Sequence, residues 1–172
     1  MKLLLALVAL AGAAPPAPPA CLTSAEAEAV ALVALPEIIR ETGIVCSATL
    51  PPSALVRQES GPLLSRYQAE ADRAWPAARA ALGKLSDPAA AVLLQSDFAR
   101  PVLLTLLVPQ LVGRIAPADC GTLDRLVTLL APLPPRNTAG VMVTTLAWLK
   151  GQTAKGRTTM VPDLPLCAEA DR

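Results

Sequence analysis

The chain contains no histidine, and aromatic residues make up only 2% of its 172 residues. Without histidine it cannot carry a histidine-containing catalytic triad, an imidazole general base or a histidine metal ligand. Charged residues are also few, at 17%, and the 15 Lys and Arg nearly balance the 14 Asp and Glu. A formal net charge of +1 offers no basic surface to nucleic acid, so we expect no nucleic-acid partner.

The residues that are present favour a folded, helical chain. Hydrophobic residues account for 53% of the sequence, which is typical of a globular protein and not of a disordered one. Thr23 and Glu26 have the spacing of a capping box, which predicts a helix over 25–42. Pro36 lies inside that range and should kink or split the helix.

Later segments carry further helix signals and one long apolar stretch, Pro101 to Val112. This stretch is shorter than the ~20 apolar residues that span a bilayer, so we expect a buried helix, interrupted at Pro109, and no transmembrane segment in the mature chain. We predict an all-α, single-domain irregular helical bundle of five to seven Pro-kinked helices, tied by two disulfides. Further helix starts are expected at four residues of the kind that caps helices: Ser53, Asp87, Asp119 and Asn137.

The first residues have the layout of a secretory signal peptide. A basic residue is followed by the apolar run Leu3 to Ala11 and then by small residues. Cleavage before Ala14 or before Cys21 fits this layout, and lipidation of Cys21 is an alternative that the preceding prolines disfavour. We therefore expect a signal peptide and Ala/Pro lead-in over 1–20, a helical domain over 21–172, and a periplasmic or extracellular location.

The four cysteines contain no CxxC pair, which argues against a thioredoxin-like redox site and a zinc ribbon. An even number of cysteines in an exported chain predicts disulfides. If the helices alternate in direction, Cys46, Cys120 and the end of the last helix near Gly151 share one end of the bundle. The segment after Gly151 is long enough to return to Cys21. Of the three pairings that four cysteines allow, we predict Cys46–Cys120 and Cys21–Cys167.

One segment is a candidate for catalysis: Ala54-Leu55-Val56-Arg57-Gln58-Glu59-Ser60-Gly61. A helix that ends in Glu-Ser-Gly resembles the catalytic glutamate segment of lytic transglycosylases, which cleave peptidoglycan outside the cytoplasm. The resemblance implies that Glu59 is the general acid, protonated in a partly apolar cleft, and donates to the glycosidic oxygen. The match is confined to this segment, no Gly-Leu-Met-Gln segment follows it, and a polar helix end accounts for the same residues.

No other motif indicates catalysis, because no serine lies in GxSxG or SxxK and no glycine-rich phosphate loop is present. We expect no cofactor and no metal, and interpret the chain as an exported helical protein that binds an apolar small molecule or an envelope protein partner. Two alternatives stay open: a peptidoglycan-cleaving enzyme that uses Glu59, and a structural subunit of an envelope complex. An apolar cavity favours the small ligand, an apolar surface patch a partner, and a cleft with buried Glu59 the enzyme.

Overall fold

The computed structural model describes residues 20–157 and 165–167, so the expected signal peptide lies outside the described residues. The fold is all-α, which confirms the predicted class, and the one pairing of extended backbone within these ranges is a bridge between Leu22 and Leu166. The helices described are α1 (Ser24–Val45), η1 (Cys46–Ala48), η2 (Leu55–Arg57), α2 (Pro62–Leu85), α3 (Pro88–Leu93), α4 (Ala99–Val112), η3 (Pro117–Asp119), α5 (Cys120–Leu130) and α6 (Pro135–Ala154), where η marks a 3-10 helix.

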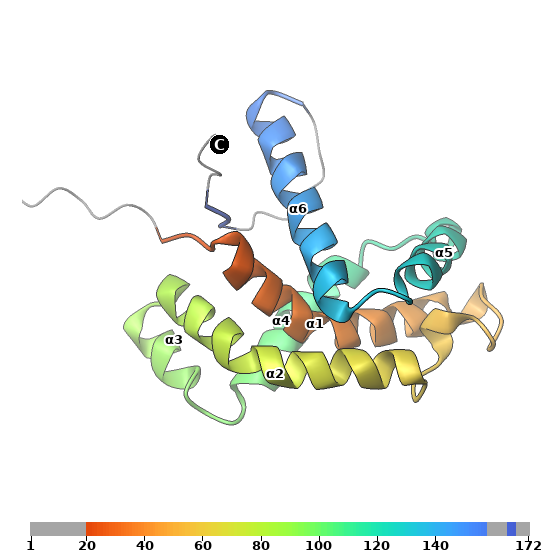
Figure 1. The fold of residues 1–172 in the computed structure, drawn as a ribbon, viewed down its shortest axis with the longest axis horizontal. Coiled ribbons are helices and arrows are strands. Elements are labelled where there is room, and N and C mark those ends of the chain that lie inside the picture. Colours follow the sequence, from red (N-terminus) through yellow and green to blue (C-terminus); the bar gives the residue numbers. More distant parts are fainter. Residues whose placement is uncertain (1–19, 158–164, 168–172) are drawn as a thin grey trace, which may run out of the picture.

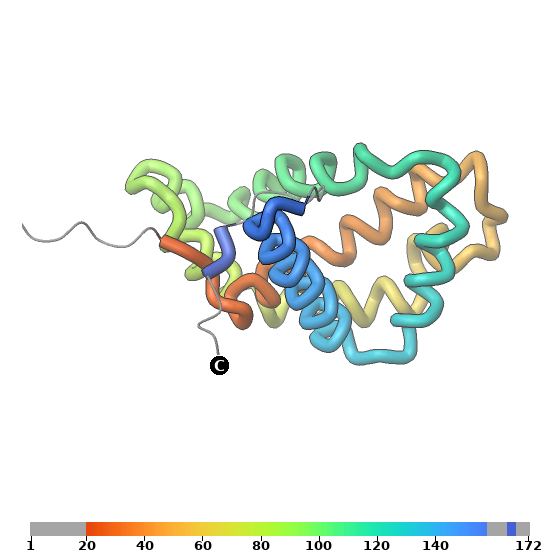
Figure 2. Tube along the Cα trace, turned by 90° about the horizontal axis from the view of Figure 1, so that it is seen from above, coloured from red at the N-terminus to blue at the C-terminus, as the bar shows by residue number. Residues whose placement is uncertain are grey.

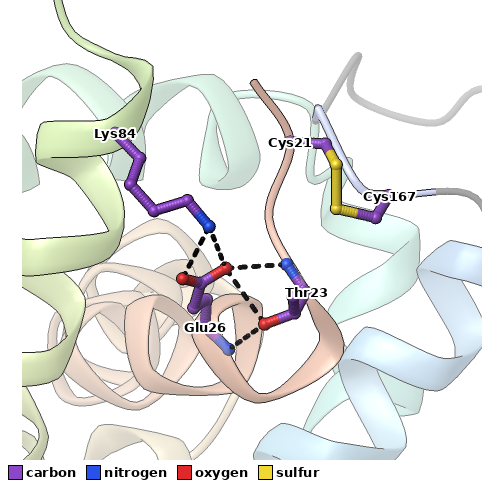
Figure 3. The surroundings of a disulfide bond; sticks show 5 residues. All are labelled: Cys21, Thr23, Glu26, Lys84 and Cys167. Carbon is purple, nitrogen blue, oxygen red and sulfur yellow. Dashed lines mark hydrogen bonds and ion pairs between the residues drawn. A yellow bond between two sulfur atoms is a disulfide. The ribbon is translucent and has the colours of Figure 1, made fainter. Parts of the chain in front are cut away.

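The start of α1 is held by the capping box that the sequence predicts. The Thr23 side chain accepts a hydrogen bond from the backbone N–H of Glu26, and the Glu26 carboxylate accepts one from the backbone N–H of Thr23 at 2.9 Å. Lys84, near the end of α2, donates to the same carboxylate at 2.7 Å (Figure 3). This ion pair joins the first turn of α1 to the last turn of α2, so the two helices run antiparallel.

The α1–α2 pair forms the centre of the core (Figure 1). Four alanines of α2 are buried at spacings of three or four residues, which places them on one face of the helix: Ala71, Ala74, Ala78 and Ala81. Their small side chains allow the larger α1 residues Leu32, Val33, Leu35 and Ile39 to pack close to the α2 backbone. α1 continues through Pro36 instead of splitting there.

The remaining helices surround this pair. Leu104 of α4 packs against the core cluster. Figure 2 shows α5 crossing the end of the molecule where α1 finishes. Figure 1 shows α6 rising away from the α1–α2 pair.

The structure confirms the predicted pairing of the cysteines. Cys46–Cys120 joins the end of α1 to the start of α5, with a Cα–Cα distance of 5.6 Å, and both residues are completely buried. Cys21–Cys167 joins the residues before α1 to the C-terminal segment, with a Cα–Cα distance of 4.9 Å (Figure 3).

The structure places α6 differently from the arrangement of helices on which the cysteine pairing was predicted. The last helix was expected to end near Cys46, so that the following segment would return along the bundle. Instead, Ala139 packs with core residues of α1, and Val143 packs with Leu22 and Ala27, close to Cys21. The first turns of α6 therefore pack towards the start of α1 and not towards Cys46.

The prediction of a helix that starts at Ser53 is wrong. The segment forms only η2, flanked by turns. Prolines at 51, 52 and 62 leave too few residues for a stable α-helix, since short helices need tertiary contacts to persist. Here the contacts fix a turn instead: the Arg57 guanidinium donates to the Leu50 carbonyl at 2.7 Å, and the Asp124 carboxylate accepts from the Val56 N–H at 3.3 Å.

Three expected helix boundaries also differ. α4 continues through Pro109. The Asp119 side chain accepts from the backbone N–H of Ala116 at 3.0 Å, so it caps η3 and not α5. α6 begins at Pro135, before the expected cap Asn137, because proline is favourable in the first turn of a helix. Asp87 caps α3 as predicted, through the N–H groups of its next turn.

The Glu26–Lys84 contact makes stability depend on pH. The hydrogen bond from Lys84, with those from Thr23, lowers the pKa of Glu26 from 4.5 to about 2. The native state therefore binds fewer protons than the unfolded chain, and the contribution of Glu26 is complete above about pH 4.5 and lost as the pH falls through 2. We expect Glu26→Gln to weaken the acid dependence of urea unfolding in this interval, and Lys84→Met to do the same. An unchanged dependence in both variants would contradict this assignment.

Candidate functional site

A groove of about 510 Å³ lies between α1 and α4, with one residue of α2 in its wall. Its volume falls in the range of roughly 300–1,000 Å³ that is usual for small-molecule sites. We call it the α1–α4 groove. It is lined by Val33, Pro36, Glu37 and Glu41 of α1, Gln68 of α2, and Arg100, Pro101, Leu104, Thr105, Val108 and Pro109 of α4.

Prolines explain why two apolar helices leave a groove at this place. Pro36 and Pro109 lie inside α1 and α4, and Pro101 lies in the first turn of α4. An internal proline donates no N–H to the carbonyl four residues before it, and its ring interrupts the regular surface of the helix. The side-chain ridges that would otherwise interdigitate are therefore disturbed where the two helices meet.

The groove carries charged groups among its apolar side chains. The Glu37 carboxylate is paired with Arg40, one turn along α1. Arg100 donates to the Asp72 carboxylate at 2.6 Å, and this guanidinium, with a smaller contribution from Gln68, holds the pKa of Asp72 below its usual value.

Glu41 differs from the other charged groups of the groove. No hydrogen bond or ion pair to its carboxylate is found within residues 20–157 and 165–167. The residue is half-buried. The groove therefore presents one carboxylate without a counter-ion beside an apolar surface.

A second, smaller cavity of about 130 Å³ lies under α5. The hydroxyl of Tyr67 donates to the Thr138 hydroxyl at 2.8 Å, and the Thr42 hydroxyl donates to the Ile38 carbonyl at 2.6 Å. Because these hydroxyls already form hydrogen bonds within the protein, the cavity offers an apolar surface. It is lined by Leu35, Ile38, Ile39, Thr42, Tyr67, Leu123, Val127, Leu130, Thr138 and Met142.

The structure places Glu59 apart from both cavities. It lies in the turn between η2 and α2, is exposed, and belongs to neither lining. The expected helix around it is absent, as described above. The role of general acid that the resemblance to lytic transglycosylases implies for Glu59 stays a prediction.

Apolar side chains are also exposed along α3 and α4. Phe98 is 75% exposed, and Val102 and Leu106 follow it at four-residue spacing on the same side of α4. Val92 and Leu93 of α3 are exposed as well. We call these five residues the α3–α4 apolar row.

The four cysteines singled out by the sequence are all in disulfides. In the part of the chain that the structure describes, no group of three or more Cys, Asp or Glu is placed to hold a metal ion. Sequence reasoning missed the groove residues Glu41 and Arg100. The feature of the sequence that could have indicated the groove was the position of prolines inside two apolar helical segments.

No single helix among residues 20–157 and 165–167 is long and apolar enough to cross a membrane. The pair Ala99–Val112 and Pro117–Leu130 reaches that length and composition only jointly, across a bend of 88°. Comparison with protein-family profiles, with curated proteins and with solved structures finds no match to this chain.

Proposed function

We propose that this is an exported helical protein that binds a small apolar ligand in the α1–α4 groove. The observation that carries the proposal is the groove itself, which has the volume of a ligand site and a mainly apolar lining. Burying apolar ligand surface against such a lining supplies the affinity, at roughly 25 cal/mol per Å² before the costs of association.

Filling the groove tests this proposal. Thr105 lines the groove and is exposed, and its hydroxyl bonds only within α4, to the Val102 carbonyl. Thr105→Trp places a large side chain at the groove with little disturbance of the core. N-phenyl-1-naphthylamine, a neutral apolar fluorophore, is expected to bind the wild-type protein saturably, and Thr105→Trp is expected to weaken this binding by about tenfold or more.

Leu106→Trp is the matched control, because Leu106 is the next residue of α4, is 64% exposed and does not line the groove. Binding of the fluorophore by this variant should equal that of the wild type. Absence of saturable binding by the wild-type protein would overturn the proposal. Loss of binding in Leu106→Trp but not in Thr105→Trp would place the bound fluorophore on the α3–α4 apolar row and overturn the proposal.

Export is part of the same proposal. Two disulfides within the described residues support an oxidising location, since disulfides persist outside the reducing cytoplasm. We expect the mature protein from its native host to begin at Ala14 or Cys21. N-terminal sequencing together with intact mass determines this, and an unprocessed Met1 in a cytoplasmic fraction would contradict it.

A protein partner is the second candidate, favoured by the α3–α4 apolar row. Large apolar side chains that are exposed to solvent, as these five are, can contribute to protein contacts. The groove experiment separates the two candidates: binding of a partner at the row should be impaired by Leu106→Trp, whereas binding in the groove should be impaired by Thr105→Trp.

A further inference from the structure

We propose that the ligand of the α1–α4 groove is a small amphiphile with one cationic group, which pairs with the Glu41 carboxylate while its apolar part lies along Pro101, Leu104 and Pro109. This inference rests on the proposed function and deepens it. It names the chemical class of the ligand and a residue that selects it.

The first argument is the charge of the groove. Glu37 is compensated by Arg40, and Arg100 by Asp72. Glu41 is the lining carboxylate for which the described residues provide no counter-ion. A ligand that covers the groove also removes water from this half-buried carboxylate, which is unfavourable unless the ligand supplies a partner. A cationic group supplies it, a neutral ligand does not, and an anionic ligand adds repulsion.

The second argument is the size of the groove. Its α1 wall extends from Val33 to Glu41, which is about 12 Å at the rise of an α-helix. A stable protein interface buries about 800 Å² on each partner, far more than a wall of this length provides. The groove volume of about 510 Å³ instead suits a small molecule. The groove therefore favours a single amphiphilic molecule over a protein surface.

The third argument is the arrangement of polar and apolar residues. Pro101, Leu104 and Pro109 offer apolar surface to a ligand, whereas Val33 and Val108 in the same lining are each only 1% exposed and belong to the core. Glu41 adds one acceptor of full negative charge to this apolar surface. A mainly apolar pocket with very few charged groups orients a ligand by its single polar end.

Three probes that share a decyl chain test the inference: decylamine, decan-1-ol and decanoate. At pH 7 they carry positive, zero and negative charge, and each is measured by displacement of N-phenyl-1-naphthylamine. We expect decylamine to bind the wild-type protein about tenfold more tightly than decan-1-ol, and decanoate to bind most weakly. The preference for decylamine should shrink as salt is added, because the Glu41 carboxylate is not fully enclosed.

Glu41→Gln keeps the shape of the side chain and removes its charge. We expect this variant to bind decylamine as weakly as decan-1-ol, with the affinity for decan-1-ol unchanged. Glu59→Gln is the matched control, because Glu59 is exposed and lies outside the groove. It should keep the wild-type order of the three probes.

The outcomes separate this inference from the proposed function. If the three probes bind equally, or if Glu41→Gln retains the preference for decylamine, the inference is wrong while groove binding that is sensitive to Thr105→Trp still stands. If no decyl probe and no fluorophore binds, both are wrong. A preference for decylamine that Glu59→Gln abolishes would place the cationic site at that turn instead and overturn the inference.

Discussion

Replacing both cysteines of either disulfide with alanine is expected to lower the free energy of unfolding by about 4–5 kcal/mol. The two bridges span 74 and 146 residues, and the stabilisation grows slowly with the length of the loop that a bridge closes in the unfolded chain. Urea unfolding of the two double variants, compared with the oxidised wild type, measures the effect. A loss below about 1 kcal/mol in both would show that the unfolded chain gains little freedom when the bridges are absent.

The two variants should differ in where they loosen the fold. α5 is joined to the end of α1 by Cys46–Cys120 and to η2 by the bond between the Val56 N–H and Asp124. Without the disulfide, α5 should exchange its amide hydrogens faster, as the side chains around the cavity beneath it separate.

At the other bridge, backbone hydrogen bonds of Leu22 with Pro165 and Cys167 remain, at 2.7 and 2.9 Å. Loss of Cys21–Cys167 should leave exchange in α5 unchanged. Faster exchange of α5 in both variants would contradict this division.

Gly43→Ala is expected to destabilise the protein by about 2–3 kcal/mol, although alanine is the better helix former. A Cβ at position 43 would lie 2.2 Å from the Val56 carbonyl oxygen and 3.0 Å from its carbonyl carbon. Both atoms belong to the backbone of η2, which cannot move by a change of rotamer. η2 would have to shift away from α1, and with it the contact to Asp124 of α5.

Gly83→Ala in α2 is the control for this substitution. Apart from its chain neighbours and the backbone of its own helix, no atom of the described residues lies within 4 Å of the Cβ it would add, so the variant should gain up to about 1 kcal/mol from helix propensity. Chemical denaturation of both variants under the same conditions measures the contrast. Equal effects at the two glycines would show that the close approach of α1 and η2 is not maintained in solution.

Much of the fold follows from local patterns that can be read in the residues. Thr23 and Glu26 cap α1 because their side chains and backbone groups lie within one turn of each other. Asp87 followed by proline starts α3 for the same local reason. The pairing of the cysteines was also correctly predicted, on the expectation that successive helices alternate in direction, although α6 takes a different path from the one expected.

Two of the expectations that failed involve contacts between residues far apart in the sequence. The 3-10 turn of η2, in place of a helix from Ser53, is held in part by Asp124, 68 residues after Val56. The direction of α6 depends on which face of α1 remains open for Ala139 and Val143. Neither contact can be predicted from the residues of a single helix, because each joins segments that are far apart in the chain.

In the candidate site, too, some features follow from local sequence and others from contacts between distant segments. Local helix signals predict an all-α chain, and an even cysteine count in a chain expected to be exported predicts two disulfides. The groove exists only because α1 and α4, some sixty residues apart, meet where each contains a proline. Among the residues that the structure describes, Glu41 has no counter-ion there, since Arg40 pairs with Glu37 and Arg100 with Asp72. The pair of Glu37 with Arg40 is local, but the pair of Arg100 with Asp72 joins residues 28 positions apart and depends on how α2 and α4 pack.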